Sequence, residues 1–412
     1  MLYKVDVIRP GSLNQIIGPV GTLKRIIKDK EYFEGRGYDF TIFTHDIFSK
    51  VESGVSVART THHKKGIIKK IKSKTRLYAR HSFVLSYLFD LRSQLHTKKL
   101  VKYYLSLNRD PDFIVFHSSV ECYQYLKYSK NKRAKVIMFQ HTDGIPFRMQ
   151  LEYYPKFKGT SYLKKKMEKL SWTARNTDHL VFIAKIGQIN FLKAFAFLDI
   201  KKTSVILNGI DDFTLSQKNE INEIKSKTFK FKYRLCCSGT INQRKGHRII
   251  IEALRGLDEN LLHDIHVSFL GEGAERIELE NLVHKYGLQD HVTFEGFVPN
   301  EQVYKYLAAS NIYILMSKNE GLPISIIEAM RAGLPVISTK ISGIPELVDK
   351  TNGILVNPDT EELKIVFNNI FRYNWSEMGH CSRVRFENEF TFERMEKEYC
   401  DMLDSMVLPS NK

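Results

Sequence analysis

Short apolar strands alternate with helical patterns along this chain, and this alternation restricts the fold more than any other feature. Strands separated by helices form parallel sheets, and a second series that starts afresh indicates a second Rossmann-like domain. The fold class predicted from this pattern is therefore α/β. The predicted strands cover residues 2–8, 38–44, 112–117, 134–141, 179–184 and 204–207 in the first series, and 233–239, 265–271, 292–296, 312–316, 335–339 and 353–357 in the second.

The boundary between the two predicted domains falls near residues 203–225, a polar region that is poor in strand patterns. This assigns residues 1–202 to an N-terminal domain and residues 203–390 to a C-terminal domain. The amphipathic stretch at residues 391–406 is predicted to be a helix that packs back on the N-terminal domain.

The composition allows each domain a core of its own, because 43% of the 412 residues are hydrophobic and 12% are aromatic. No apolar run approaches the roughly 18 residues of a membrane span, and the first residues lack the apolar region of a signal peptide. A cytoplasmic location is expected. The five cysteines show no paired spacing, so neither a zinc site nor a disulfide framework is predicted.

The formal net charge of +17 indicates a polyanionic partner or surface. The basic excess is concentrated in residues 62–80, where aliphatic side chains recur at roughly helical spacing, and no Asp or Glu occurs between residues 53 and 89. A basic amphipathic helix of this kind is typical of an anionic membrane surface. The alternative is a solvated helix with an ordinary core face.

Two glutamates, Glu320 and Glu328, lie eight positions apart after the predicted strand at residues 312–316. Glu320 precedes a helix and Glu328 lies about two turns into it, so both can face one cleft beside the helix N-terminus. A carboxylate accepts hydrogen bonds from vicinal hydroxyls, which sugars and ribose both present. The turn formed by Gly321, Leu322 and Pro323 lets backbone amides approach a ligand closely.

Two cations, Arg244 and Lys245, lie in a strand-to-helix turn that ends in Gly246. At such a turn, cations and backbone amides can neutralise a diphosphate. The turn begins with Gly239 and Thr240, directly after the predicted strand at residues 233–239.

These segments resemble family 4 retaining glycosyltransferases of the bacterial surface-polysaccharide type, which carry an E-x7-E motif and have the GT-B fold. The resemblance implies two Rossmann-like domains whose parallel sheets face each other across a central cleft, with the acceptor on the N-terminal domain and a nucleotide-sugar donor on the C-terminal domain. It implies that Glu320 contacts donor-sugar hydroxyls, that Glu328 holds the ribose, and that Lys245 stabilises the leaving diphosphate. Thr240 occupies the place of the family's arginine, and we expect Arg244 to substitute for it.

Further glycines and one histidine match the family pattern. Gly21 resembles a loop glycine near the donor, and His141, at a strand end, corresponds to a histidine near the reacting sugars. His117, after the preceding strand, is interpreted as structural. Two readings stay open for Gly271 and Gly273, which either let the backbone approach the nucleotide or only turn the strand.

The predicted function is transfer of a sugar from a nucleoside-diphosphate sugar, with UDP as the expected nucleotide, to a glycan or lipid-linked acceptor, by front-face attack with retention of configuration. No cofactor or metal is expected, because the D-x-D sequence at residues 110–112 precedes a strand and reads as a turn. The enzyme is expected to be peripheral at the inner face of the plasma membrane, with no nucleic-acid partner.

Alternative functions remain for this sequence. One is a nucleotide-sugar epimerase or hydrolase of the GT-B fold, which would use the same donor half. Another is a non-catalytic protein, either a basic binding protein or a subunit that lacks activity because Thr240 replaces the arginine.

Overall fold

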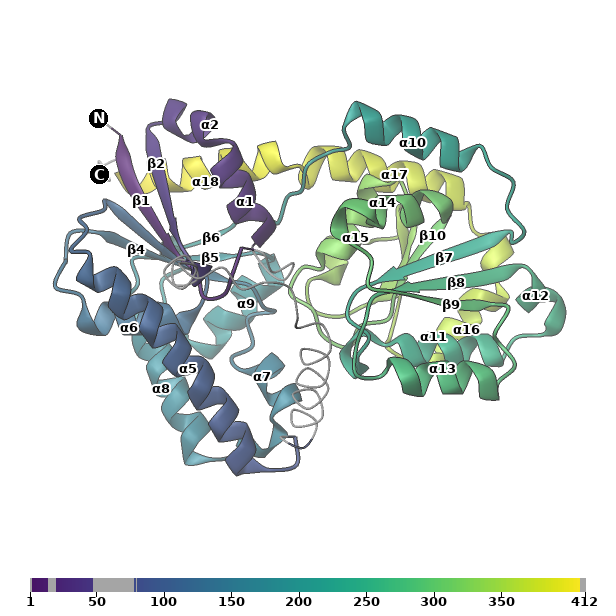
Figure 1. Ribbon diagram of the computed structural model, residues 1–412, viewed down its shortest axis with the longest axis horizontal. Helices are drawn as coiled ribbons and strands as arrows, with labels where there is room; N and C mark the ends of the chain where they lie inside the picture. Colours follow the sequence, from purple (N-terminus) through teal and green to yellow (C-terminus); the bar gives the residue numbers. More distant parts are fainter. Residues whose placement is uncertain (1, 14–19, 47–77, 79, 408–412) are drawn as a thin grey trace, which may run out of the picture. The chain divides into compact units, whose positions relative to one another are not determined.

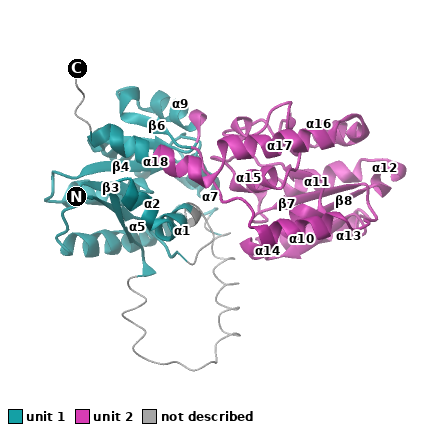
Figure 2. Ribbon diagram, turned by 90° about the horizontal axis from the view of Figure 1, so that it is seen from above, with its two compact units in different colours: residues 1–183, 187–206, 400–412 teal, residues 184–186, 207–399 magenta. Residues whose placement is uncertain are grey.

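The computed structural model describes residues 2–13, 20–46, 78 and 80–407. The chain forms two compact units. Unit 1 contains residues 1–183, 187–206 and 400–412, and unit 2 contains residues 184–186 and 207–399 (Figure 2).

Unit 1 is built on a parallel sheet of six strands in the order β2-β1-β3-β4-β5-β6 (Figure 1). The strands are β1 (Tyr3–Ile8), β2 (Tyr38–Phe43), β3 (Phe113–Phe116), β4 (Lys135–Gln140), β5 (His179–Phe182) and β6 (Thr203–Val205). The helices are α1 (Val20–Lys28), α2 (Lys30–Gly35), α5 (Phe83–Ser106), α6 (Ser119–Tyr128), α7 (Arg148–Tyr153), α8 (Ser161–Asn176) and α9 (Lys185–Ala194). The first two residues of α9 group with unit 2.

The core of unit 1 lies between this sheet and helices α5, α6, α8 and α9. Strand side chains such as Ile114, Phe116 and Met138 are fully buried there, and they pack with Leu100 of α5 and Cys122 of α6. Strands that are buried on both faces read as continuous apolar runs, which is why the sequence pattern located them.

Unit 2 contains a second parallel sheet of six strands, in the order β12-β11-β10-β7-β8-β9. The strands are β7 (Tyr233–Ser238), β8 (Ile265–Leu270), β9 (Val292–Gly296), β10 (Ile312–Leu315), β11 (Val336–Thr339) and β12 (Gly353–Val356). The helices are α10 (Leu215–Lys225), α11 (His247–Arg255), α12 (Glu259–His263), α13 (Arg276–Lys285), α14 (Asn300–Ala309), α15 (Ile324–Arg331), α16 (Thr360–Asn368), α17 (Trp375–Glu389) and α18 (Phe392–Val407).

The strand order of unit 2 reverses between β7 and β10, which are direct neighbours in the sheet. From this point the chain winds outward in opposite directions, and the loops that follow β7 and β10 start from neighbouring positions at the same edge of the sheet. Ligands of open α/β sheets bind at such switch points, beyond the carboxyl ends of the strands.

The predicted α/β fold class is confirmed, and each predicted strand overlaps one of the twelve observed strands. The units divide between Ile206 and Leu207 rather than between residues 202 and 203, because β6 pairs with β5 in the sheet of unit 1. The last part of α18 groups with unit 1, where Asp404 accepts hydrogen bonds from Arg36 and Tyr38.

The basic segment at residues 62–80 lies outside the described residues except for Tyr78 and Arg80. None of the helices in the described ranges combines the length and the hydropathy needed to cross a membrane.

Candidate active site

Two loops meet at the switch point of unit 2, one after β7 (residues 239–246) and one after β10 (residues 316–323). The backbone amide of Lys318 donates a hydrogen bond to the carbonyl oxygen of Arg244 at 2.7 Å. Gly246 has a φ of +73°, and a Cβ atom there would lie 1.9 Å from the carbonyl oxygen of Met316. Only glycine allows so close an approach of the two loops, so Gly246 brings the cationic turn against the end of β10.

Glu320 holds both predicted cations. Its Oε1 atom lies 2.8 Å from Nζ of Lys245 and 2.8 Å from a guanidinium nitrogen of Arg244, and it also accepts a hydrogen bond from Ser317. Glu320 is 7% exposed. Burial opposes its ionisation, but the charges of Lys245 and Arg244 outweigh burial and lower the pKa of Glu320. Glu320 is therefore ionised at neutral pH, and its two basic partners give the trio an excess of positive charge.

The cationic turn is held by side chains that the sequence did not single out. Oδ1 of Asn242 accepts hydrogen bonds from the backbone amides of Arg244 and Lys245, at 3.1 and 3.2 Å. Arg244 also donates to the carbonyl oxygen of Asn319 at 2.7 Å. Asn242 precedes a 3-10 turn at Gln243–Lys245, and an Asn in that place is the signal that could have identified the cap.

The pKa of Glu328 shifts in the opposite direction to that of Glu320. Glu328 is half-buried in α15. No described residue donates a hydrogen bond to its carboxylate or forms an ion pair with it. Burial raises the pKa of Glu328, and the charges of Arg331 and Lys245 only partly oppose this. The charge of Lys245 acts on this carboxylate. A hydrogen-bond acceptor without an internal partner is suited to receive hydroxyl donors from a ligand.

The predicted glycines after β7 and β8 have a packing role. Gly239 and Gly271 have φ values of +143° and +145°. A Cβ atom at Gly271 would lie 1.9 Å from the carbonyl oxygen of Gly239, and one at Gly273 would lie 1.8 Å from that of Ile241. The close approach of these two loops accounts for the glycines. Thr240, which directly follows Gly239, is exposed.

The turn before α15 is likewise closely packed. The carbonyl oxygen of Gly321 would lie 2.0 Å from a Cβ atom at Gly343. Leu322 is buried, and Pro323 directly precedes the first residue of α15. In unit 1, the predicted Gly21 is the second residue of α1.

His141 lies in unit 1, after β4, where it contacts His117 at the end of the neighbouring strand β3. The Nδ1 atom of His117 and the Nε2 atom of His141 are 2.9 Å apart. Burial, followed by the charge of Arg9, lowers the pKa of His141 to about 4. Sequence reasoning gave His117 only a structural role and missed this contact, although two histidines at the ends of adjacent strands are a signal for it.

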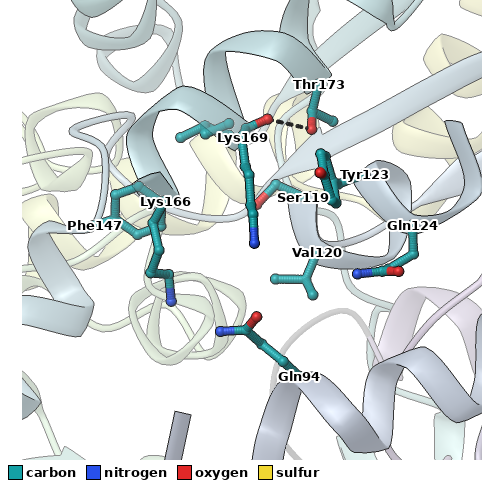
Figure 3. A pocket seen from close by; sticks show the side chains of 10 residues that line it. Gln94, Ser119, Val120, Tyr123, Gln124, Phe147, Lys166, Lys169 and Thr173 are labelled. Carbon is teal, nitrogen blue, oxygen red and sulfur yellow. Dashed lines mark hydrogen bonds between the residues drawn. The ribbon is translucent and has the colours of Figure 1, made fainter. Parts of the chain in front are cut away.

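A further pocket in unit 1 lies between α5, α6 and α8 (Figure 3). Lys166 lines it and donates to the buried carboxylate of Asp90 at 2.7 Å, while Lys169 extends into the space beside Tyr123. Asp90 also accepts hydrogen bonds from Gln94 and from residues of α7 and α8. None of the residues predicted for the site lines this pocket.

The D-x-D sequence belongs to unit 1. Asp110 accepts a hydrogen bond from Asn131, and Asp112 accepts one from the backbone amide of Lys4. Within the described part of the chain, no group of three or more His, Cys, Asp or Glu side chains is placed to hold a metal ion.

Comparisons with known proteins connect this geometry to an activity. Residues 218–370 match the family model described as glycosyl transferases group 1. An uncharacterized glycosyltransferase of Methanocaldococcus jannaschii is 29% identical over 284 residues, which cover 67% of this chain and 69% of that protein. The O-antigen biosynthesis glycosyltransferase WclY of Escherichia coli is 26% identical over 56% of this chain and 62% of its own length.

The fold is similar to that of solved structures. The crystal structure of Anabaena HepE in complex with UDP superposes with a TM-score of 0.66 at 17% identity, covering 98% of this chain and 100% of that chain. The chain is a glycosyltransferase of the GT-B fold.

The match to the family model falls within unit 2 of this glycosyltransferase. It includes both loops of the switch point, and so Lys245, Glu320 and Glu328. His117 and His141 lie outside the matched residues.

Proposed function

We propose that this glycosyltransferase is a retaining enzyme of family 4 that moves a sugar from a UDP-sugar to a hydroxyl of a glycan or lipid-linked acceptor in the synthesis of a cell-surface polysaccharide. The observation that carries the proposal is the arrangement at the switch point. Glu320 there holds Lys245 and Arg244 together, next to a half-buried carboxylate, Glu328, that has no partner among the described residues.

The cations would stabilise the leaving group. As the bond between the sugar and the diphosphate breaks, negative charge builds on the diphosphate oxygens. Lys245 and Arg244 are fixed in advance by Glu320 and Asn242, so they need little reorganisation to receive that charge. Preorganised donors of this kind are worth most in a site that excludes water.

The carboxylates would orient the donor. Glu328 would accept hydrogen bonds from the ribose hydroxyls. The hydrogen bond and ion pairs of Glu320 use Oε1, which leaves Oε2 for a hydroxyl of the donor sugar. Hydrogen bonds to an ionised acceptor are roughly twice as strong as neutral ones.

The resemblance to family 4 supports retention, and the surroundings of the two carboxylates argue against a covalent intermediate on either of them. Glu320 is paired with two cations, which makes it a poor nucleophile, and Glu328 would be occupied by the ribose. We therefore assign front-face attack by the acceptor hydroxyl, whose proton passes to the departing phosphate. Lys245 and Arg244 would take the place of a divalent metal ion, so the rate is expected to be unchanged by a chelator.

The comparisons support the choice of donor and process. HepE of Anabaena was solved in complex with UDP, and WclY of Escherichia coli acts in O-antigen biosynthesis. The net charge of +17 supports a location at an anionic membrane surface, on the cytoplasmic side of the plasma membrane.

Thermal-shift measurements with a panel of nucleotides and nucleotide sugars test the donor. A ligand that binds only the folded chain raises the melting temperature by mass action, and UDP is expected to do so more than GDP. The configuration of the product at its anomeric carbon, read by NMR, tests retention. Inversion would rule out the proposed mechanism, and release of free sugar or an epimer without acceptor would favour a hydrolase or an epimerase.

A further inference from the structure

Three aromatic rings lie close together at the carboxyl ends of β3 and β4. His117 lies one residue beyond β3, whereas Phe139 and His141 lie two positions apart at the end of β4 and so point to the same side of the sheet. The ring of His117 is 5.0 Å from that of Phe139 and 5.1 Å from that of His141, with interplanar angles of 28° and 24°. These contacts limit how either imidazole can rotate.

The contact between the histidines requires one donor and one acceptor. Nδ1 of His117 lies 2.9 Å from Nε2 of His141. Burial lowers the pKa of both imidazoles well below neutrality, so each ring carries a single N–H. Two arrangements satisfy the bond: His117 donates from Nδ1, or His141 donates from Nε2.

The remaining nitrogen of His117 decides between them. Nε2 of His117 is buried and has no hydrogen-bond partner in the described part of the chain. A buried N–H without an acceptor is among the rarest polar defects in proteins, and an unsatisfied acceptor is tolerated better. The proton of His117 therefore resides on Nδ1 and is donated to Nε2 of His141. Neutral His141 must then carry its own proton on Nδ1.

We propose that His117 is a positioning residue that fixes His141 as a neutral hydrogen-bond donor through its Nδ1–H group. This inference rests on the proposed function and on the expectation from the sequence that His141 lies near the reacting sugars. His141 is partly exposed, and Nδ1 is the nitrogen left for a ligand. A donor at that position binds a sugar oxygen but cannot remove a proton from the acceptor, which agrees with transfer of that proton to the leaving phosphate.

NMR of the full chain labelled with 15N-histidine tests the tautomers directly. Two-bond 1H–15N correlations distinguish the Nδ1–H, Nε2–H and doubly protonated rings, and His117→Asn and His141→Asn assign the two signals among the 14 histidines. Both rings are expected as Nδ1–H tautomers at pH 7. An Nε2–H tautomer or an imidazolium at His141 would overturn the proposal.

Amide substitutions test the role in transfer, because an Asn amide reaches roughly the place of Nδ1 and a Gln amide that of Nε2. His117→Phe keeps an aromatic ring at this position and removes the hydrogen-bond donor, so we expect a fall in kcat of up to about tenfold with little change in the KM for the sugar donor. His117→Asn should restore much of this loss, and His141→Asn should be more active than His141→Gln. Replacement of the exposed His380 by Phe serves as the matched control.

The two measurements separate failure of the inference from failure of the proposed function. The NMR spectrum needs no turnover, so a chain that transfers no sugar can still show the Nδ1–H pair. If the wild type transfers sugar and His117→Phe has the same kcat and melting temperature, the role of His117 is overturned while the proposed function stands.

Discussion

Glu320 and Glu328 show how strongly local surroundings divide two residues of the same type. Glu320 is buried against Lys245 and Arg244, which lower its pKa below that of a free glutamate. Glu328 is half-buried without a partner among the described residues, and burial raises its pKa. A carboxylate that is desolvated and unpaired weakens the fold, which suggests that Glu328 is kept for a ligand.

The substitution Glu328→Gln should weaken UDP binding and strengthen the unliganded fold. Loss of a charge-assisted hydrogen bond, roughly 1.5–3 kcal/mol, predicts an affinity at least tenfold lower by calorimetric titration. The pKa of Glu328 is higher in the folded chain than in the unfolded chain. The unfolding free energy of the wild type therefore decreases as the pH rises from the unfolded pKa through the folded pKa. The gain in unfolding free energy in urea should therefore be present at pH 7 and disappear toward the unfolded pKa, about 4.3.

Glu223→Gln is the matched control, because Glu223 is exposed in α10. It should change neither the UDP affinity nor the pH dependence. Unchanged UDP binding in Glu328→Gln would contradict the role of Glu328 in holding the ribose.

At the level of elements, the turn after β7 and the loop after β10 approach each other at a glycine, where any side chain would clash. Gly246 combines a positive φ with a Cβ position 1.9 Å from the carbonyl oxygen of Met316. Gly287 has a similar φ of +67°, but nothing lies within 4 Å of its Cβ position. A comparison of substitutions at Gly246 and Gly287 therefore separates the effect of backbone strain from that of a steric clash.

Both Gly246→Ala and Gly287→Ala should lose about 1–2 kcal/mol of unfolding free energy from the left-handed backbone. Gly246→Ala should lose roughly a further 1–3 kcal/mol from overpacking, and it should bind UDP more weakly because the clash displaces Lys245. Urea denaturation and UDP titration of the two variants check this. Equal losses in both would mean that the loops have room to separate.

The strands could be predicted from the sequence because parallel strands buried on both faces are continuous apolar runs, as in β3 and β10. The meeting of Lys245 with Glu320 could not, since it depends on β7 and β10 being neighbours, although the residues are far apart in sequence. The same limit explains His117, whose contact with His141 follows from the pairing of β3 with β4. The roles of Gly271 and Gly273 stayed open because the sequence does not show which loops approach each other.

On the scale of the whole molecule, the excess positive charge is the property that the active site does not explain. The net charge is +17 over 412 residues, whereas the trio of Glu320, Lys245 and Arg244 carries a net charge of +1. The remaining excess favours an anionic surface, and lysine and arginine near a charged bilayer each contribute about 1 kcal/mol.

The enzyme should therefore co-sediment with vesicles that contain phosphatidylserine at low ionic strength. The bound fraction should fall steeply between roughly 50 and 300 mM salt, as screening shortens the range of the attraction. Vesicles of phosphatidylcholine alone are the control and should bind little. Equal binding to both vesicles, or stronger binding to RNA than to phosphatidylserine, would contradict a membrane location.

Lys245 at the switch point is proposed to receive the diphosphate of the donor. Calorimetric titration of UDP into the wild type, Lys245→Ala and Lys318→Ala tests it most directly, since Lys318 lies in the adjoining loop and is exposed. Lys245→Ala should weaken UDP binding about 10- to 100-fold and slow transfer by roughly 10²–10³, while Lys318→Ala stays within about twofold of the wild type. A Lys245→Ala variant with wild-type affinity and rate would contradict the account.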